Sequence, residues 1–239
     1  MKSLGASAAL AVCAFALAAQ TKDPLTVDLG YAQYRGVADT SLGINTFFGI
    51  RYAASPTGAR RWDVPYMIEH HNNYDSNTVM NATKYGPMCI QSKPYWNFSS
   101  KAIPDQPGSE DCLLLDILVP AKPANSRLNV MVQIHGGGYV GGNSQTYPGY
   151  ALVLQSAGNI IYVSMQYRLG ALGFLSGSEI RKNGVPNAGL LDQRAALHWV
   201  QNHIGAFGGD PAKVTIIGGS AGGGSVLNQL ILKGGADNP

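Results

Sequence analysis

The chain has 239 residues, of which 45% are hydrophobic and 13% are charged, and its formal net charge is +3. No internal repeat, low-complexity tract or heptad pattern is present, so the sequence is typical of a globular chain. The positive charges are scattered and form no basic stripe, and we therefore expect no nucleic-acid partner.

The first segment along the chain is residues 1–18, which carry Lys2, then a run of small and apolar residues, and end in Ala16-Leu17-Ala18. This is the pattern of a secretory signal peptide cleaved after Ala18 or Ala19. The apolar run is shorter than the roughly 20 residues needed to span a bilayer, and no later run approaches that length. We expect a secreted, extracellular protein without an integral membrane segment, whose mature chain is residues 19–239.

Two segments at the start of the mature chain, Thr26–Val37 and Thr46–Tyr52, alternate and carry β-forming residues, which predicts an antiparallel hairpin. Residues 53–110 are dense in Pro, Asn, Ser and Tyr and are predicted to be mostly loop. Asn81-Ala82-Thr83 and Asn97-Phe98-Ser99 in this region are N-glycosylation acceptors. Asn81 and Asn97 are therefore expected at the surface.

The cysteines point to the same compartment. Cys13 leaves with the signal peptide, so the mature chain keeps Cys89 and Cys112. A pair in a secreted chain predicts one disulfide, which would stabilise the fold by about 3 kcal/mol in the chain-entropy model. The alternative is two free buried thiols. No cluster of histidine and cysteine has zinc spacing, so we expect no metal.

The second half of the chain predicts an α/β fold. Short apolar runs predict buried parallel strands, a longer periodic run predicts a helix, and a further strand and helix follow. In chain order these are Leu113–Val119, Val130–Ile134 and Ile160–Gln166, then the helix Leu190–Ile204, then Val214–Ile217 and Ala221–Leu232. In the first helix Leu190, Leu197, Val200 and Ile204 share one face. No linker or shift of composition marks a second domain.

A glycine-rich segment, His135-Gly136-Gly137-Gly138-Tyr139, follows the strand at 130–134. Backbone without side chains lets amide N–H groups converge on a developing oxyanion, and one such donor is typically worth about 10²–10³ in rate. The run through Gly141 also satisfies Gly-x-Gly-x-x-Gly, but a dinucleotide site needs an acidic residue about 20 residues further on. None occurs between Asp116 and Glu179, which excludes that site.

Ser220 lies at the centre of Gly218-Gly219-Ser220-Ala221-Gly222, between a strand and a helix. A serine in Gly-x-Ser-x-Gly on such a turn is the nucleophile elbow of an α/β-hydrolase. The strained backbone pushes the hydroxyl out of the turn, and side chains at Gly218 and Gly222 would collide. We therefore expect Ser220 to be the nucleophile of an α/β-hydrolase with a mostly parallel central sheet and an N-terminal antiparallel hairpin.

The histidines do not complete this site. In an α/β-hydrolase the acid and the histidine follow the serine in chain order, and no histidine follows Ser220 here. His135 is expected to shape the glycine-rich turn, His198 and His203 to lie in a helix, and His70 and His71 in a loop. We expect a fragment that ends after the elbow helix and lacks the triad acid and histidine.

Together these motifs resemble the type-B carboxylesterase family, which includes cholinesterases and fungal secreted lipases. Phe207 to Gly222 fit the family's active-site signature, and Glu110 to Pro120 fit its second signature, with Leu114 in place of the usual aromatic residue or threonine. Further landmarks are Phe48 to Ala53, Tyr167-Arg168-Leu169 and Asn187 to Arg194. The resemblance runs from about residue 26 to residue 232 and covers about the N-terminal half of the family's catalytic domain. Gly219 stands where the family usually carries glutamate.

The resemblance implies roles for particular residues. Ser220 would be the nucleophile, the amides of Gly137, Gly138 and Ala221 would form the oxyanion hole, and Tyr139 would line the substrate gorge. Cys89 and Cys112 would form the family's first disulfide, and Arg61 and Glu110 a structural salt bridge. The alternative for these two charges is a solvated pair worth about 0–1 kcal/mol.

The implied activity is hydrolysis of a small-molecule or lipid carboxylic ester through a serine acyl-enzyme, without a cofactor. The alternatives are a non-catalytic interaction protein, as in neuroligin-like relatives, and an inactive truncated pseudoenzyme. The hormone-sensitive-lipase group shares the glycine-rich and elbow motifs but lacks the Glu-Asp-Cys-Leu run. Trp96 is not at the choline-binding position of cholinesterases, so a choline ester is not expected. The acyl and alcohol preference and the oligomeric state do not follow from the sequence.

Overall fold

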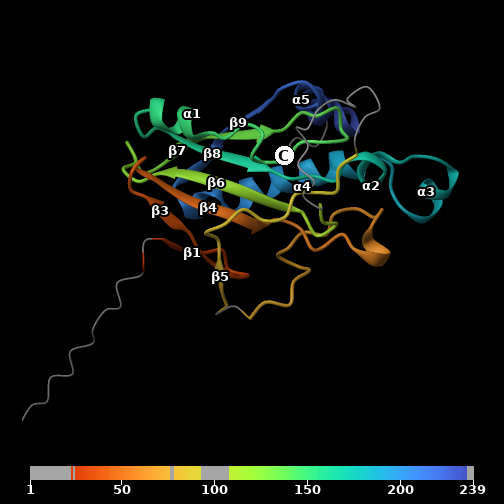
Figure 1. Cartoon of the computed structure of the whole chain (residues 1–239), viewed down its shortest axis with the longest axis horizontal. Helices are drawn as coiled ribbons and strands as arrows, with labels where there is room; N and C mark the ends of the chain where they lie inside the picture. The colour runs from red at the N-terminus through yellow and green to blue at the C-terminus, as the bar shows by residue number, and fades with distance from the viewer. Residues whose placement is uncertain (1–22, 24, 76–77, 93–107, 236–239) are drawn as a thin grey trace, which may run out of the picture.

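A six-stranded mixed sheet forms the centre of the molecule (Figure 1). The computed structural model describes residues 23, 25–75, 78–92 and 108–235. The strand order is β3 (Val37–Asp39), β4 (Ile44–Arg51), β6 (Leu114–Pro120), β8 (Ile160–Met165), β7 (Leu128–Ile134) and β9 (Gly209–Gly218). Within the described residues, β9 is therefore one edge of the sheet.

The strands of this sheet run in two directions. β8, β7 and β9 are parallel, which confirms the parallel strands expected there. The expectation of a parallel strand at 113–119 is wrong, because β6 pairs antiparallel with both β4 and β8. Both faces of β6 are buried. An apolar run of this kind reports burial on two faces and carries no information on strand direction.

The N-terminal hairpin also differs from the expected one. β1 (Thr26–Asp28) and β2 (Gln33–Arg35) form their own antiparallel hairpin, and β5 (Val79–Asn81) adds parallel to β2 in a separate three-stranded sheet. β3 then pairs antiparallel with β4 in the large sheet. The segment 26–37 is interrupted at Gly30, where φ is 82°, and at Gly36, where a Cβ would lie 2.5 Å from the Thr46 carbonyl oxygen.

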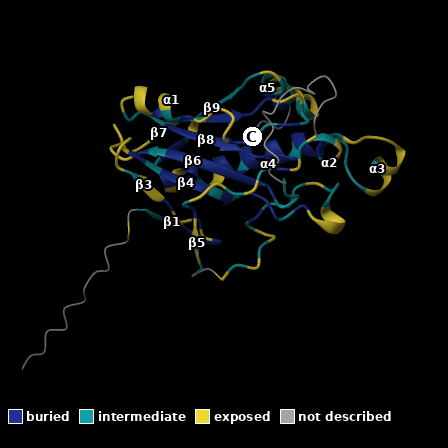
Figure 2. Cartoon of the chain, viewed as in Figure 1, coloured by how far each residue is buried: buried dark blue, intermediate teal, exposed yellow. Residues whose placement is uncertain are grey.

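Helices cover both faces of the large sheet. α4 (Ala188–His203) and α5 (Ala221–Ile231) pack on one face, and α1 (Tyr150–Gln155) packs on the other. The short helices α2 (Gly170–Phe174) and α3 (Ser178–Asn183) lie beyond one end of the sheet (Figure 1). Further turns of helix in the described residues are η1 (Gly58–Arg60), η3 (Ile204–Phe207) and η4 (Leu232–Gly235). Burial follows these layers, with the central strands buried and α3 and the outer turns exposed (Figure 2).

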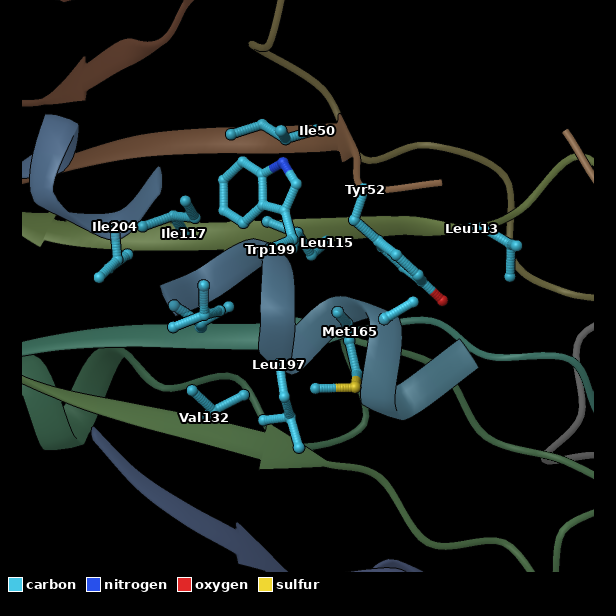
Figure 3. Packing of buried hydrophobic residues seen from close by; sticks show 14 of the residues in the cluster. Ile50, Tyr52, Leu113, Leu115, Ile117, Val132, Met165, Leu197, Trp199 and Ile204 are labelled. Atoms are coloured by element: carbon cyan, nitrogen blue, oxygen red, sulfur yellow. The ribbon is translucent and has the colours of Figure 1, made fainter. Parts of the chain in front are cut away.

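The core is densest where α4 crosses the sheet. Trp199 is fully buried, lies beside Ile50 of β4 and Leu115 of β6, and donates from its Nε1 to the Tyr31 hydroxyl at 3.0 Å (Figure 3). The helix expected at 190–204 is confirmed and begins two residues earlier. Its expected apolar face is buried, but the polar residues Asp192–Arg194 are buried as well, so α4 is enclosed on nearly every side.

One side of the molecule leaves apolar groups in contact with solvent. Leu227, Leu230 and Ile231 of α5 are 65%, 52% and 69% exposed. A cavity of about 240 Å³ lies next to them, and its lining includes Leu197 of α4, Val214 and Ile216 of β9, and Leu230. The edge strand β9, this cavity and the outer side of α5 thus form one apolar region. Across the described residues, no helix has the length and apolar character to cross a membrane.

Candidate active site

Ser220 occupies the turn between β9 and α5 with a backbone conformation that L-residues rarely adopt. Its φ is 55° and its ψ is −125°. A Cβ on Gly218 would lie 2.3 Å from the backbone of Gly222, and a Cβ on Gly222 would lie 2.1 Å from the Ile134 carbonyl oxygen. Only glycine fits at either position. The close approach of chain on both sides of Ser220 maintains its strained conformation.

The turn exposes the serine at the start of a helix. Ser220 is exposed, and α5 begins at the next residue, Ala221. The first amides of a helix have no partner within it and carry the positive end of the helix dipole. The Ala221 amide is therefore available to a negatively charged oxygen formed beside Ser220.

The glycine-rich loop after β7 lies against this turn. A Cβ on Gly136 would lie 3.1 Å from the Ser220 Cβ and 2.6 Å from the Gly219 carbonyl oxygen. Gly137 and Gly138 follow with φ of 114° and 63°, and both are exposed. As far as the chain is described, neither of their amides donates a hydrogen bond to a protein acceptor. The loop thus places two free donors one and two residues after Gly136, where the chain approaches Ser220 too closely to leave room for a side chain.

His135 and Tyr167 hold the base of this loop. The Nδ1 of His135 lies 2.8 Å from the Gly136 carbonyl oxygen, which can only accept, so Nδ1 carries the proton. Burial lowers the pKa of His135 to about 4, so the ring is neutral near pH 7. The Tyr167 hydroxyl donates to the His135 carbonyl oxygen at 2.7 Å. These contacts agree with a role for His135 in shaping the turn.

Tyr139 closes the loop over α5. Its φ is 61°, and its carbonyl oxygen accepts from the Gly170 amide at 2.7 Å. Its ring lies 4.8 Å from that of Phe174 on α2. A Cβ on Gly224 would lie 3.0 Å from the Tyr139 hydroxyl, so this side chain reaches over the first turns of α5. Tyr139 therefore borders the region around Ser220.

The other residues singled out in the sequence lie outside this site. Cys89 and Cys112 form a disulfide, and the Arg61 Nε lies 2.8 Å from the Glu110 Oε2. Asn81 is exposed on β5. Asn97, Trp96 and the segment 1–18 lie outside the described residues.

No histidine in the described residues forms a hydrogen bond with Ser220. The Nε2 of His203 lies 2.6 Å from the Glu69 Oε1, at the far end of α4. His70 and His71 lie in the loop between η1 and β5, and His71 packs on the Tyr66 ring. Nor do three or more metal-ligating side chains gather anywhere in the described ranges.

Two buried acidic residues, Asp192 and Asp116, were not identified from the sequence as functional. Asp192 of α4 accepts from the Arg168 side chain at 2.6 Å and 2.8 Å and from its backbone amide at 3.0 Å. This pair ties the segment that contains Tyr167 to α4. Asp116 of β6 accepts from the Gly49 amide at 2.8 Å, and burial raises its pKa to about 6. The sequence did hold a signal for Asp116, because it lies within the apolar run Leu113–Val119. An acidic residue in such a run is buried and therefore needs a hydrogen-bond donor as partner.

Comparison with known proteins places these features in one family. The model for "Carboxylesterase family" matches residues 23–236. The chain is 36% identical over 258 residues to carboxylesterase patB of Aspergillus clavatus, which covers 89% of this chain and 46% of that protein. It is 44% identical to mouse carboxylesterase 1E over 77% of this chain and 32% of the relative. It is 41% identical to para-nitrobenzyl esterase of Bacillus subtilis over 84% of this chain and 39% of that protein.

Solved structures agree. EstA of Aspergillus niger superposes with a TM-score of 0.72 at 39% identity, covering 85% of this chain and 37% of that one. A PNB esterase superposes with a TM-score of 0.77 at 36% identity, covering 90% and 42%. The chain spans less than half the length of these curated relatives and solved structures. With its glycine-rich loop against a serine elbow in an α/β-hydrolase fold, the chain belongs to the carboxylesterase family.

Proposed function

We propose that this polypeptide carries the nucleophile and the oxyanion hole of an enzyme that hydrolyses carboxylic esters. One observation carries the proposal. Ser220 is exposed, has a φ of 55° and lies against the glycine-rich loop, in which the amides of Gly137 and Gly138 have no protein acceptor in the described residues. Donors held ready where negative charge develops are the largest single contribution to many acyl-transfer reactions. The substrate class is a small-molecule or lipid ester, in keeping with the names of the relatives.

The reaction proceeds through an acyl-enzyme. The Ser220 oxygen attacks the ester carbonyl carbon while a general base takes the hydroxyl proton. The carbonyl oxygen becomes an oxyanion that accepts from the amides of Gly137, Gly138 and Ala221. The carbon–oxygen bond to the alcohol then breaks, and the protonated base returns its proton to the leaving oxygen. Water, deprotonated by the same base, attacks the acyl carbon, the bond from that carbon to the Ser220 oxygen breaks, and the base returns its proton to this oxygen as the acid leaves.

The base is the part of this mechanism that the described residues do not provide. We propose that it lies in polypeptide outside this sequence, so that the 239 residues alone hydrolyse esters slowly or not at all. The non-catalytic readings, an interaction protein or a pseudoenzyme, predict no hydrolysis in any polypeptide that contains this sequence.

The test uses protein expressed from the complete gene. Hydrolysis of a short p-nitrophenyl ester and covalent labelling by a fluorophosphonate are measured for the native protein, Ser220→Ala and Ser176→Ala. Ser176 is also an exposed serine and lies between α2 and α3, outside the β9–α5 turn. Ser220→Ala is expected to abolish labelling and to lower turnover by up to about 10⁶, as in another serine hydrolase, whereas Ser176→Ala changes neither. Undiminished turnover in Ser220→Ala would show that another residue is the nucleophile.

We also propose that the protein is secreted and carries N-linked glycans. The proposal is supported by the exposed sequon asparagine Asn81 and by the Cys89–Cys112 disulfide, a type of bond that persists in oxidising compartments. Secreted protein from a eukaryotic host should lose mass on treatment with a glycosidase, and Asn81→Gln should remove part of that mass. Retention of the protein in the cytosol would contradict the proposal.

A further inference from the structure

The side chain of Gln91 binds the backbone at the end of the glycine-rich loop. Its Nε2 donates to the Gly142 carbonyl oxygen at 2.9 Å, and its Oε1 accepts from the Gly142 amide at 3.2 Å. Next to it, the Ser92 amide donates to the Val140 carbonyl oxygen at 2.8 Å. Three hydrogen bonds thus join residues 91–92 to residues 140–142, about 50 positions later in the chain.

Residues 140–142 in turn determine where Gly137 lies. The Gly137 carbonyl oxygen accepts from the amides of Val140 and Gly141 at 3.1 Å and 3.0 Å, which closes the loop into a tight turn. The turn has no spare room, because a Cβ on Gly137 would lie 2.1 Å from the Gly141 carbonyl oxygen. Any displacement of residues 140–142 must therefore move Gly137 and its amide.

Gly142 is enclosed between Gln91 and the base of the loop. Its φ is 100°, and a Cβ there would lie 2.5 Å from the His135 Nδ1 and 2.3 Å from the Gly136 carbonyl oxygen. His135 and Tyr167 hold the start of the loop, at His135 and Gly136. Gln91 holds its end, at Gly142. A loop fixed at both its start and its end keeps its free amides at a constant distance from Ser220.

Gln91 itself is anchored independently of the loop. Cys89, two residues earlier, is bonded to Cys112, and the Ser109 amide donates to the Met88 carbonyl oxygen at 2.8 Å. Cys112 lies two residues before the start of β6. The position of Gln91 is thus set by the disulfide and by the central sheet.

We propose that Gln91 is a positioning residue for the oxyanion hole: through Gly142 it fixes the Gly137 and Gly138 amides relative to Ser220. The proposal rests on the proposed function for its catalytic consequence, although the mechanical link holds without it. Preorganised donors lose most of their effect when they can move, because their reorganisation is then added to the barrier. Loss of the Gln91 amide is expected to lower kcat by about 10- to 100-fold with little change of KM.

The main experiment does not depend on catalytic activity. Amide hydrogen exchange is measured by NMR on ¹⁵N-labelled, perdeuterated protein from the complete gene for the native protein, Gln91→Met and Gln145→Ala. Methionine matches glutamine in length but makes neither hydrogen bond to Gly142. Gln145 is an exposed glutamine shortly after the same loop and serves as the control.

In Gln91→Met, the amides of Val140 and Gly141 are expected to exchange about tenfold faster and the Gly137 and Gly138 signals to shift, although Gln91 bonds to none of these four amides. Gln145→Ala should change none of them. A change confined to Gly142 would overturn the proposal, because it would show that Gln91 makes a local contact only. If Gln91→Met does not fold, Gln91→Glu keeps the oxygen that accepts from Gly142 and replaces only the donor, and the same readout applies.

The catalytic consequence is tested in protein from the complete gene. A fall in kcat with unchanged KM supports the proposal, and an unchanged kcat overturns it. If Ser220→Ala shows no loss of activity while exchange at Val140 and Gly141 responds to Gln91→Met, the mechanical link stands and the proposed function fails. If Ser220→Ala abolishes activity while exchange at Val140 and Gly141 is unchanged in Gln91→Met, the proposed function stands and the role of Gln91 is overturned.

Discussion

The Tyr167 hydroxyl donates a hydrogen bond to the carbonyl oxygen of His135 at 2.7 Å, and the two rings stack with centroids 4.3 Å apart. Both residues are buried, one just after β8 and the other just after β7. The pair therefore joins the ends of two adjacent parallel strands directly beneath the glycine-rich loop. A second buried pair, Arg168 with Asp192, connects the same segment to α4.

Tyr167→Phe is expected to lower the free energy of unfolding by about 1–3 kcal/mol. The substitution keeps the stacked ring but leaves the buried His135 carbonyl oxygen without this donor. Urea titration followed by fluorescence measures the change. Tyr147→Phe is the control, because Tyr147 is 44% exposed, and its effect should stay within about 0.5 kcal/mol. Equal effects of the two substitutions would contradict the role of the Tyr167 hydroxyl.

Two glycines of the elbow are expected to respond oppositely to alanine. At Gly222 a Cβ would lie 2.1 Å from the Ile134 carbonyl oxygen, so Gly222→Ala should destabilise by about 1–3 kcal/mol. At Gly219 the nearest atom to a Cβ is the Tyr147 hydroxyl oxygen at 3.6 Å, and φ is not positive. Gly219→Ala should therefore stabilise the fold by about 0.4–1 kcal/mol, because alanine lowers the conformational entropy of the unfolded chain. Thermal unfolding of both variants checks the pair, and a stable Gly222→Ala would refute the steric argument.

The same geometry predicts that Gly219 accepts a longer side chain. Gly219→Glu introduces the residue that the family usually carries there, and its Cβ would meet no described atom closer than the Tyr147 hydroxyl oxygen at 3.6 Å. We expect a folded variant whose fluorophosphonate labelling at Ser220, in protein from the complete gene, is at least as fast as that of the native protein. A fall in the labelling rate would mean that the glycine is itself required at this position.

Asp116 and His135 are expected to have opposite effects on stability in acid. Burial raises the pKa of Asp116 to about 6, so the folded state binds this proton more tightly than the unfolded chain does. Its stabilising contribution is complete below about pH 4 and is lost as the pH rises to 6. Burial lowers the pKa of His135 to about 4, so its contribution is complete above about pH 6.5 and is lost as the pH falls to 4. Between pH 4 and 6, the changes that Asp116 and His135 cause in the free energy of unfolding therefore largely cancel.

Asp116→Asn should remove the contribution of Asp116 to this pH dependence and leave that of His135. Asparagine keeps an oxygen for the Gly49 amide but does not ionise in this range. Relative to the native chain, the free energy of unfolding of the variant should fall by about 3 kcal/mol as the pH is lowered from 7 to 4. Urea titrations at five pH values measure this difference. A difference that does not change with pH would show that Asp116 titrates normally.

The chain of 239 residues expressed by itself is expected to self-associate. The sheet edge β9 and the exposed side chains Leu227, Leu230 and Ile231 form one apolar region. An open edge beside apolar surface invites pairing with other chains. Sedimentation should show association that increases with concentration, and Ile231→Lys should reduce it. A monomer with cooperative unfolding at all concentrations would contradict this expectation.

The sequence by itself determined the features that depend on neighbours along the chain. The helix at 190–204 follows from the spacing of Leu190, Leu197 and Val200, because helical periodicity is local. The turn at Ser220 follows from Gly218 and Gly222, since a side chain at Gly218 collides with a residue only four positions away. The strands at 130–134 and 160–166 follow from apolar runs of the right length.

Only the tertiary structure decided which segments meet. β6 runs antiparallel because it pairs with β4 and β8, and its apolar run is compatible with either direction. The contact of Gln91 with Gly142 spans 51 positions, and that of Tyr167 with His135 spans 32. A glutamine or a tyrosine in a loop forms hydrogen bonds equally well with water or with any carbonyl. Its partner is decided by the packing of the sheet, which brings distant backbone groups together and excludes water from them.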